Sequence, residues 1–96
     1  MYILFLMEIK SFRWDINTIE HIANHSVSPD EVEEVTFDDE PYIRKGRQDR
    51  RYLYGQTIGG RYLFVVYILL PIKEAKVITA RDMDEKEKRL YLRRGK

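Results

Sequence analysis

The sequence predicts an α+β domain in which two N-terminal helices and one C-terminal helix pack on a curled antiparallel sheet of four to five strands. Helix-start signals occur early and late in the chain, and apolar strand-like runs fill its middle. The joins between those runs are too short for parallel crossovers. A length of 96 residues fits one domain with a thin core, residues 1–96.

Residues 1–14 read as an extended segment that supplies the first strand, because β-favouring residues continue to Trp14. A helix is expected over residues 17–25, with Asn17 as its N-cap and Glu20 three residues later. A second helix begins at Ser28, where a capping serine, a proline and then Glu31 form the clearest start signal in the chain.

The strands of the second half follow in close order. Residues 42–44 are expected to form a short edge strand, and residues 51–58 a longer strand that alternates in polarity. The pair Gly59-Gly60 is a hairpin signal, and the almost wholly apolar run 62–70 is typical of a central strand covered on both faces. A further strand is expected over residues 75–80.

The last element is a helix that we expect to begin at Asp82, with Glu85 at its third position. Acidic residues at its start and Arg93-Arg94 at its end both suit the helix dipole.

Composition excludes several classes of protein. Apolar residues make up 44% of the chain and charged residues 34%, which is typical of a globular domain rather than a disordered tail. Without cysteine, neither a disulfide framework nor a thiolate metal site can form. The apolar opening, residues 1–7, is too short to span a bilayer and lacks signal-peptide features, so we expect no membrane association and a cytoplasmic location. Met7 is an alternative start to Met1.

Charge is uneven along the chain although the net charge is only +1. Acids crowd residues 30–40, whereas bases crowd residues 44–51 and 86–96. Three arginines, Arg51, Arg61 and Arg81, stand at the ends of apolar runs, where they can present guanidinium groups to an anion at one edge of the sheet. Phosphate is the commonest such anion. The alternative is that each is a solvated arginine or a partner of the nearby acids.

The order and spacing of several short motifs resemble the BrnT toxin family from about residue 12 to residue 91. The motifs are Phe12-Arg-Trp14-Asp15, Asn24-His25-Ser26-Val27-Ser28 leading into Glu31, Phe37-Asp38, Arg51, Gly55, Gly60-Arg61, Ala80-Arg81 and Glu87-Lys-Arg89-Leu-Tyr91. The family usually has a Lys-His-Gly step where this chain has Asn24-His25-Ser26, so a positive charge near the expected site is missing.

The resemblance implies the toxin half of a type II toxin–antitoxin pair, with a fold similar to RelE-type ribonucleases. Such toxins cleave RNA without a metal ion and thereby block translation. A BrnA-like antitoxin binds the toxin, and operator DNA is bound only through the antitoxin. The resemblance therefore implies a metal-independent endoribonuclease with no cofactor.

Metal-free RNA cleavage needs proton transfer and positive charge at the phosphorus. His25 is the proton-transfer candidate, since imidazole titrates near neutrality, and Arg51, Arg61 and Arg81 are the catalytic cations. Arg89 and Tyr91 are candidates for substrate binding. Alternatively, His25 interacts with carbonyls at a helix end and Tyr91 lies at the edge of the core.

Two further readings remain open. His21 and His25 have a spacing that can bind zinc, but the sequence offers no third ligand, so no metal site is expected. The tyrosines between arginines at residues 51–54 and 61–62 suit RNA stacking and ordinary strand faces equally.

The main functional hypothesis is a ribonuclease toxin. The alternative is a catalytically weakened toxin-like module that acts with its antitoxin as a transcriptional repressor, with Asn24 as the altered position. Either protein is expected to form a homodimer or a 2:2 complex.

Overall fold

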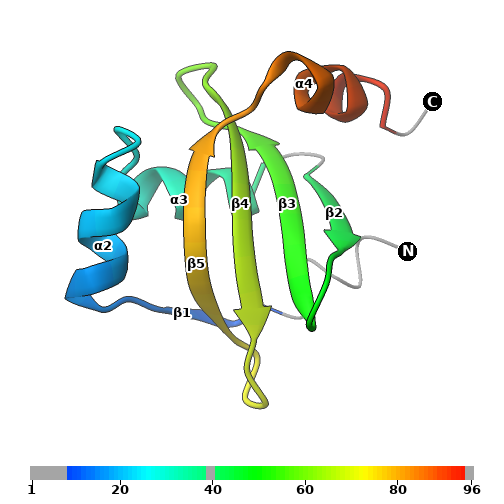
Figure 1. Cartoon of the computed structure of the whole chain (residues 1–96). Coiled ribbons are helices and arrows are strands. Elements are labelled where there is room, and N and C mark those ends of the chain that lie inside the picture. The colour runs from blue at the N-terminus through cyan, green and yellow to red at the C-terminus, as the bar shows by residue number, and fades with distance from the viewer. Residues whose placement is uncertain (1–8, 39–40, 95–96) are drawn as a thin grey trace.

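A computed structural model describes residues 9–38 and 41–94 of the chain. Three helices and five strands form one α+β unit (Figure 1). In chain order they are β1 (Ser11–Arg13), α2 (Ile16–Ala23), α3 (Pro29–Thr36), β2 (Tyr42–Lys45), β3 (Arg50–Gln56), β4 (Tyr62–Leu69), β5 (Glu74–Asp82) and α4 (Glu85–Leu92). The predicted fold class and the order of its elements are confirmed. The part of the expected first strand before residue 9 lies outside the described residues.

The strands form one sheet in the order β1-β5-β4-β3-β2, so the apolar strand β4 is central, as predicted. Strands β2 to β5 pair antiparallel with their chain neighbours. Strand β1 instead pairs parallel with β5, and the sheet is therefore mixed rather than wholly antiparallel. The short joins predict antiparallel pairing only between strands that follow each other in the chain. Because β1 and β5 are separated by most of the chain, their parallel pairing needs no short crossover.

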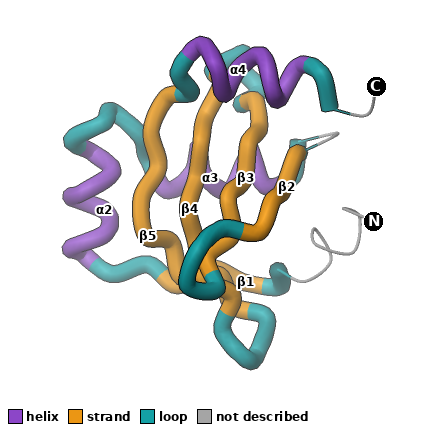
Figure 2. Tube along the Cα trace, turned by 45° about the vertical axis from the view of Figure 1, so that its right-hand side comes forward, coloured by secondary structure: helices purple, strands orange, loops and turns teal. Residues whose placement is uncertain are grey.

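The main core lies on one face of the sheet, between the strands and helices α2 and α3. Figure 2 shows α3 crossing behind the strands on this face. Helix α3 crosses behind β3 and β4, and α2 lies beside β5. Val32 and Val35 of α3 are fully buried against Leu53, Leu63 and other strand residues. Gly55 of β3 allows this close approach, because a Cβ atom there would lie 2.7 Å from the carbonyl oxygen of Val35.

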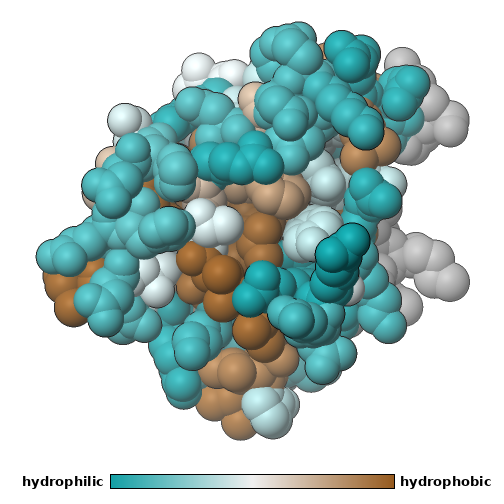
Figure 3. All heavy atoms as spheres, viewed as in Figure 1, coloured by the Kyte–Doolittle hydropathy of each residue, from teal (hydrophilic) through white to brown (hydrophobic). Residues whose placement is uncertain are grey.

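Among the described residues, only α4 covers the opposite face of the sheet, and it does so at one end, so we call this the open face. Its lining is the second apolar cluster, formed by Tyr54, Phe64, Val66, Met83 and Tyr91. Hydrophobic residues run from the middle of this face to its lower end, with hydrophilic residues above them and on both sides (Figure 3). No helix within residues 9–38 and 41–94 is long and apolar enough to cross a membrane.

Two of the three predicted helix caps are displaced. Ser28 caps α3 with the expected reciprocal capping box to Glu31. Helix α2 is capped by Asp15 rather than Asn17, since the Asp15 carboxylate accepts a hydrogen bond from the Thr18 backbone. Helix α4 is capped by Asp84, two residues after the expected Asp82, because β5 continues through Asp82.

Candidate functional site

Arg61 stands just before β4 and joins three separate segments. Its Nε donates to Oδ1 of Asp82 at 2.7 Å, and its Nη1 donates to Oε1 of Glu31 at 3.1 Å. The same guanidinium donates to the carbonyl oxygens of His25 and Ser26, at 3.1 and 2.5 Å. Hydrogen bonding to the Asp82 carboxylate raises the pKa of Arg61 above its ordinary value. Arg61 therefore holds the turn after α2 in place, and we call this set of contacts the Arg61 clamp. Its guanidinium is already occupied by groups of the protein itself.

That turn holds a strained residue. Ser26 has a φ of 59°, in the left-handed region that glycine adopts more easily. The amides of Ser26 and Val27 donate to the carbonyls of Ala23 and Ile22, as in a Schellman ending of a helix. The Lys-His-Gly step expected from the family resemblance has its glycine at this position. Arg61 binds the two carbonyls of the strained turn and so fixes the position of His25.

A pair of imidazoles lies beside the clamp. The rings of His21 and His25 meet edge to face, with centroids 5.5 Å apart. Nε2 of His21 is 3.0 Å from Oγ1 of Thr79 on β5. Thr79 is opposite Val66 of β4, so it stands at the border of the open face. His21 of α2 and His25 of the turn after it thus place two exposed imidazoles at one corner of that face.

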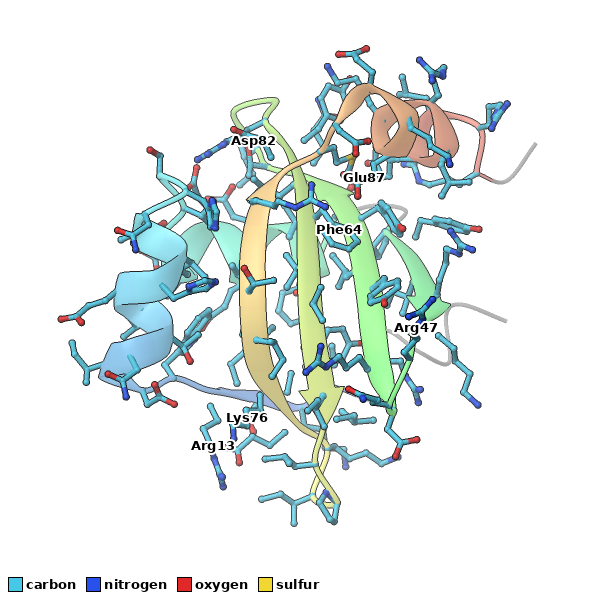
Figure 4. All side chains as sticks on the ribbon, viewed as in Figure 1. Arg13, Arg47, Phe64, Lys76, Asp82 and Glu87 are labelled. Atoms are coloured by element: carbon cyan, nitrogen blue, oxygen red, sulfur yellow. The ribbon has the colours of Figure 1, made fainter. Side chains whose placement is uncertain are left out.

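Arg81 lies farther along β5, on the same face of the sheet as Thr79. It is two residues beyond Thr79 on β5, so both side chains project to the same face. Its Nη1 and Nη2 donate to the two carboxylate oxygens of Glu87 at 2.8 and 2.9 Å, and its Cζ lies 4.6 Å from the centre of the Phe64 ring. Figure 4 shows Glu87 beside α4, above Phe64. The Glu87 hydrogen bonds raise the pKa of Arg81, which stays a cation.

The geometry of this pair bears on phosphate binding. A carboxylate held by both Nη atoms occupies the place that two phosphate oxygens would take. The side chain of Arg81 is 38% exposed, so a ligand approaching from the open face can reach it.

Arg51 does not join this corner, and the expectation that the three arginines meet at one rim is wrong for it. Arg51 is the second residue of β3 and is opposite Tyr67, near the end of β4. Arg61 directly precedes β4, and Arg81 of β5 is opposite Phe64, near the start of β4. Tyr67 is five positions after Tyr62, which corresponds to about 17 Å along β4. The antiparallel course of β3 places its first residues at the far end of the sheet. A catalytic role for Arg51 stays a prediction.

The two substrate-binding candidates on α4 differ in environment. Tyr91 is only 2% exposed, and its hydroxyl donates to Oδ2 of Asp38 at 2.5 Å. Burial and the Asp38 carboxylate both raise its pKa, so it keeps its proton. Tyr91 therefore has the packing position that the sequence had left as an alternative. Arg89 is exposed, and a contact with substrate there stays a prediction.

Sequence reasoning missed three members of the corner. His21 was considered only as half of a zinc spacing, and Thr79 and Glu87 were not assigned to a site. No local pattern could have found them, since Thr79 meets His21 across 58 positions of the chain. Within the described part of the chain, no three His, Asp or Glu side chains are grouped as a metal site.

A pocket of about 380 Å³ lies away from the corner, between the end of α3 and the β3–β4 turn. Its two carboxylates are already engaged. Glu34 accepts the amide of Ile58 at 3.0 Å, and Asp38 accepts the amide of Gln56 at 3.0 Å. We assign no chemistry to this pocket.

The described residues thus form a small α+β domain in which an imidazole pair and a guanidinium lie on one face of the sheet. The family described as "Ribonuclease toxin, BrnT, of type II toxin-antitoxin system" matches residues 14–87, and the chain belongs to this family. The family resemblance inferred from the sequence is thereby confirmed.

The structure is also similar to the 1.1 Å crystal structure of the ribonuclease toxin BrnT from Brucella abortus, with a TM-score of 0.64. The two are 18% identical, and the match covers 78% of this chain and 97% of the other. At this identity the likeness shows the fold. No curated protein matched the chain in sequence.

Proposed function

We propose that this protein is a metal-independent endoribonuclease whose catalytic corner is formed by His25, His21, Thr79 and Arg81. The observation that carries the proposal is the strand register, which puts Arg81 on the same face of β5 as Thr79, the partner of His21, whose ring contacts His25. The family membership supplies the class of activity. Translation inhibition and a cytoplasmic site of action belong to the same proposal.

The reaction needs only groups present in this corner and in the RNA. An imidazole takes the proton of a 2′-hydroxyl, whose oxygen attacks the adjacent phosphorus. The bond to the 5′-oxygen breaks, and that oxygen takes a proton either from the second imidazole, present as its protonated imidazolium, or from the first one after it has taken the 2′-hydroxyl proton. The products are a 2′,3′-cyclic phosphate and a 5′-hydroxyl. Arg81, released from Glu87, stabilises the negative charge that builds on the phosphoryl oxygens.

Each residue has a distinct task in this proposal. His25 is exposed and its backbone is held by Arg61, so it is assigned the proton transfer. His21 is held by Thr79 and borders His25. Arg61 acts through His25 and is a positioning residue, not a phosphate ligand.

The test is cleavage of a labelled single-stranded RNA by the purified protein in the presence of EDTA. We expect wild-type cleavage with cyclic phosphate ends, and a loss of about 100-fold or more in His25→Gln and in Arg81→Gln. Arg93→Gln, an exposed change at the end of α4, is the matched control and should cleave normally. Intact RNA with the wild-type protein, or unchanged cleavage by both variants, would refute the proposal.

A second function is favoured by one specific observation. Both arginines near the corner are bound to carboxylates, Arg61 to Glu31 and Asp82, and Arg81 to Glu87. A toxin-like module that keeps these pairs closed would not cleave RNA but would still bind its antitoxin and act as a repressor.

The two functions can be separated directly. Membership of a type II toxin–antitoxin family implies an antitoxin partner. We propose that it is a BrnA-like protein, encoded next to this chain, that carries the contact with operator DNA. For the module, the free protein leaves RNA intact, whereas the mixture retards operator DNA in a gel. A ribonuclease cleaves RNA when free and stops when the antitoxin is added. A homodimer or 2:2 complex stays a prediction for either case.

A further inference from the structure

The β2–β3 hairpin carries a dense positive charge. Residues 44–51 contain five bases and one acid, a net charge of +4 compared with +1 for the whole protein. Arg13, Arg61 and Arg81 all form ion pairs with carboxylates. Among the described residues, by contrast, no carboxylate pairs with the exposed cations Arg44, Lys45 and Arg47 or with the partly exposed Arg50.

An aromatic ring stands in the middle of these cations. Tyr52 of β3 is directly opposite Arg44 of β2, and Arg50 is two residues before it, so all three project to the open face. The Tyr52 ring is partly exposed and packs 5.5 Å from the ring of Phe64. Figure 4 shows Arg47 on the side of the hairpin and Phe64 over β4 on this same face.

The hairpin is held rigidly. Gln48 and Asp49 have φ values of 56° and 63°, as a type I′ turn requires, and the amide of Arg50 donates to the carbonyl of Arg47. The Tyr52 ring covers Gly46 so closely that a Cβ atom there would lie 2.4 Å from its Cζ. The ring orientation therefore needs glycine at this position, and the cations and the ring form a preorganised surface.

The strand register connects this surface with the catalytic corner. Arg44 is opposite Tyr52, Tyr52 is opposite Val66, and Val66 is opposite Thr79, the partner of His21. The row runs straight across four strands to α2. Two strand spacings separate Tyr52 from Thr79, about 10 Å. Neighbouring nucleotides of one RNA strand can therefore reach both ends of the row.

We propose that the hairpin is a docking platform for single-stranded RNA beside the scissile step, in which Tyr52 stacks on a base and Arg44 and Arg50 contact the adjacent phosphates. Stacking on a tyrosine next to arginines is the usual way in which proteins hold unpaired RNA. The proposal rests on the proposed ribonuclease function, because it assigns the substrate's flanking nucleotides to a second part of the same face.

The test measures binding of a fluorescein-labelled 2′-O-methyl RNA, which lacks the attacking hydroxyl and is not cleaved. We expect Tyr52→Leu to bind it about 5- to 150-fold more weakly, and Tyr52→Phe to bind normally because the ring is kept. Arg44→Gln with Arg50→Gln should lower the slope of log affinity against log salt by about 0.7 for each arginine. The matched control, Lys10→Gln with Lys73→Gln, removes two charges near β1, at the other edge of the sheet, and should change neither binding nor cleavage.

Three outcomes would contradict the proposal. If the wild-type protein cleaves RNA and the hairpin variants bind and cleave normally, the platform is refuted and the ribonuclease function stands. If the wild-type protein neither binds nor cleaves RNA, both are refuted. If the hairpin variants keep RNA binding but lose the antitoxin, the hairpin is a protein-binding surface instead. Melting temperatures of all variants identify any loss that is due to unfolding.

Discussion

Arg61 shows how completely one side chain can be used inside a small fold. Its guanidinium meets two carboxylates and two carbonyl oxygens that come from the α2–α3 turn, α3 and β5. A guanidinium forks onto a carboxylate and onto a phosphate with the same geometry, so an arginine at a strand end predicts an anion without saying which one. For Arg61 the anions belong to the protein.

Arg61→Ala should lower the free energy of unfolding by about 2 kcal/mol, because charged hydrogen-bond partners lose their donor. Arg61→Lys should recover only part of this, since an ammonium cannot bridge the same four acceptors. Urea denaturation measures both changes, with Arg93→Ala as the surface control. A change below about 0.5 kcal/mol for Arg61→Ala would contradict the clamp.

The Arg61–Asp82 pair makes stability depend on acid. Hydrogen bonding to Arg61 holds the pKa of Asp82 below its ordinary value of 3.8. As pH falls, Asp82 is therefore protonated in the unfolded chain before it is protonated in the folded protein. The stabilisation by the Arg61–Asp82 pair is complete above pH 3.8 and is lost as pH falls through the lower pKa that Asp82 has in the folded protein. Because Asp82 is 63% exposed, we expect no more than about 1 kcal/mol.

Thermal unfolding of the wild-type protein and of Asp82→Asn at a series of pH values measures this dependence. The two proteins should differ near neutral pH and converge in acid. A difference that stays constant down to strongly acidic pH would mean that the pair does not contribute in this way.

At the scale of elements, a few residues decide how the helices pack on the sheet. Helix α3 reaches β3 at Gly55, and the capping box of Ser28 and Glu31 starts that helix beside the Arg61 clamp. Glu87 has a similar double task, since it caps α4 through the Asp84 amide and also binds Arg81. The cap and the site are therefore built from the same carboxylates.

Gly55→Ala should cost about 1–3 kcal/mol of unfolding free energy, because the new methyl group meets the Val35 backbone and the helix must move away from the sheet. Gly59→Ala is the matched control. A Cβ atom there would lie no closer than 3.8 Å to Thr57, so we expect a change within about 0.5 kcal/mol. Denaturant titration of both variants compares them. Equal stability of the two would show that α3 can shift freely.

For the whole molecule, the open face is the surface that a partner would cover. It combines an apolar floor with a surplus of positive charge, which suits RNA and equally an acidic protein segment laid over it. RNA and the acidic segment would then exclude each other, and an antitoxin bound there would keep RNA from the toxin. A thin core of this size also gains stability from any partner that binds only the folded state.

Addition of the antitoxin at about 100 times its dissociation constant should stabilise the protein by about 2.7 kcal/mol. For a domain of this size, that shift corresponds to a rise in melting temperature of about 10 to 20 °C. Differential scanning fluorimetry with and without the purified partner measures it. A melting temperature that does not move would argue against binding to the native state.

The sequence by itself determined the elements and the family. The Ser28 cap and the central strand β4 depend on residues a few positions apart, and local spacing decides such features. The caps of α2 and α4 were displaced by two residues because several acceptors compete at each helix start.

Only the tertiary structure decided which residues form the site. The partners Glu31 and Asp82 are 30 and 21 positions from Arg61, and no local rule could choose between them and a phosphate. The same holds for Thr79 beside His21 and for Arg51 at the far end of the sheet. Register across an antiparallel sheet brings distant residues into one row, and that register forms only when the strands pair.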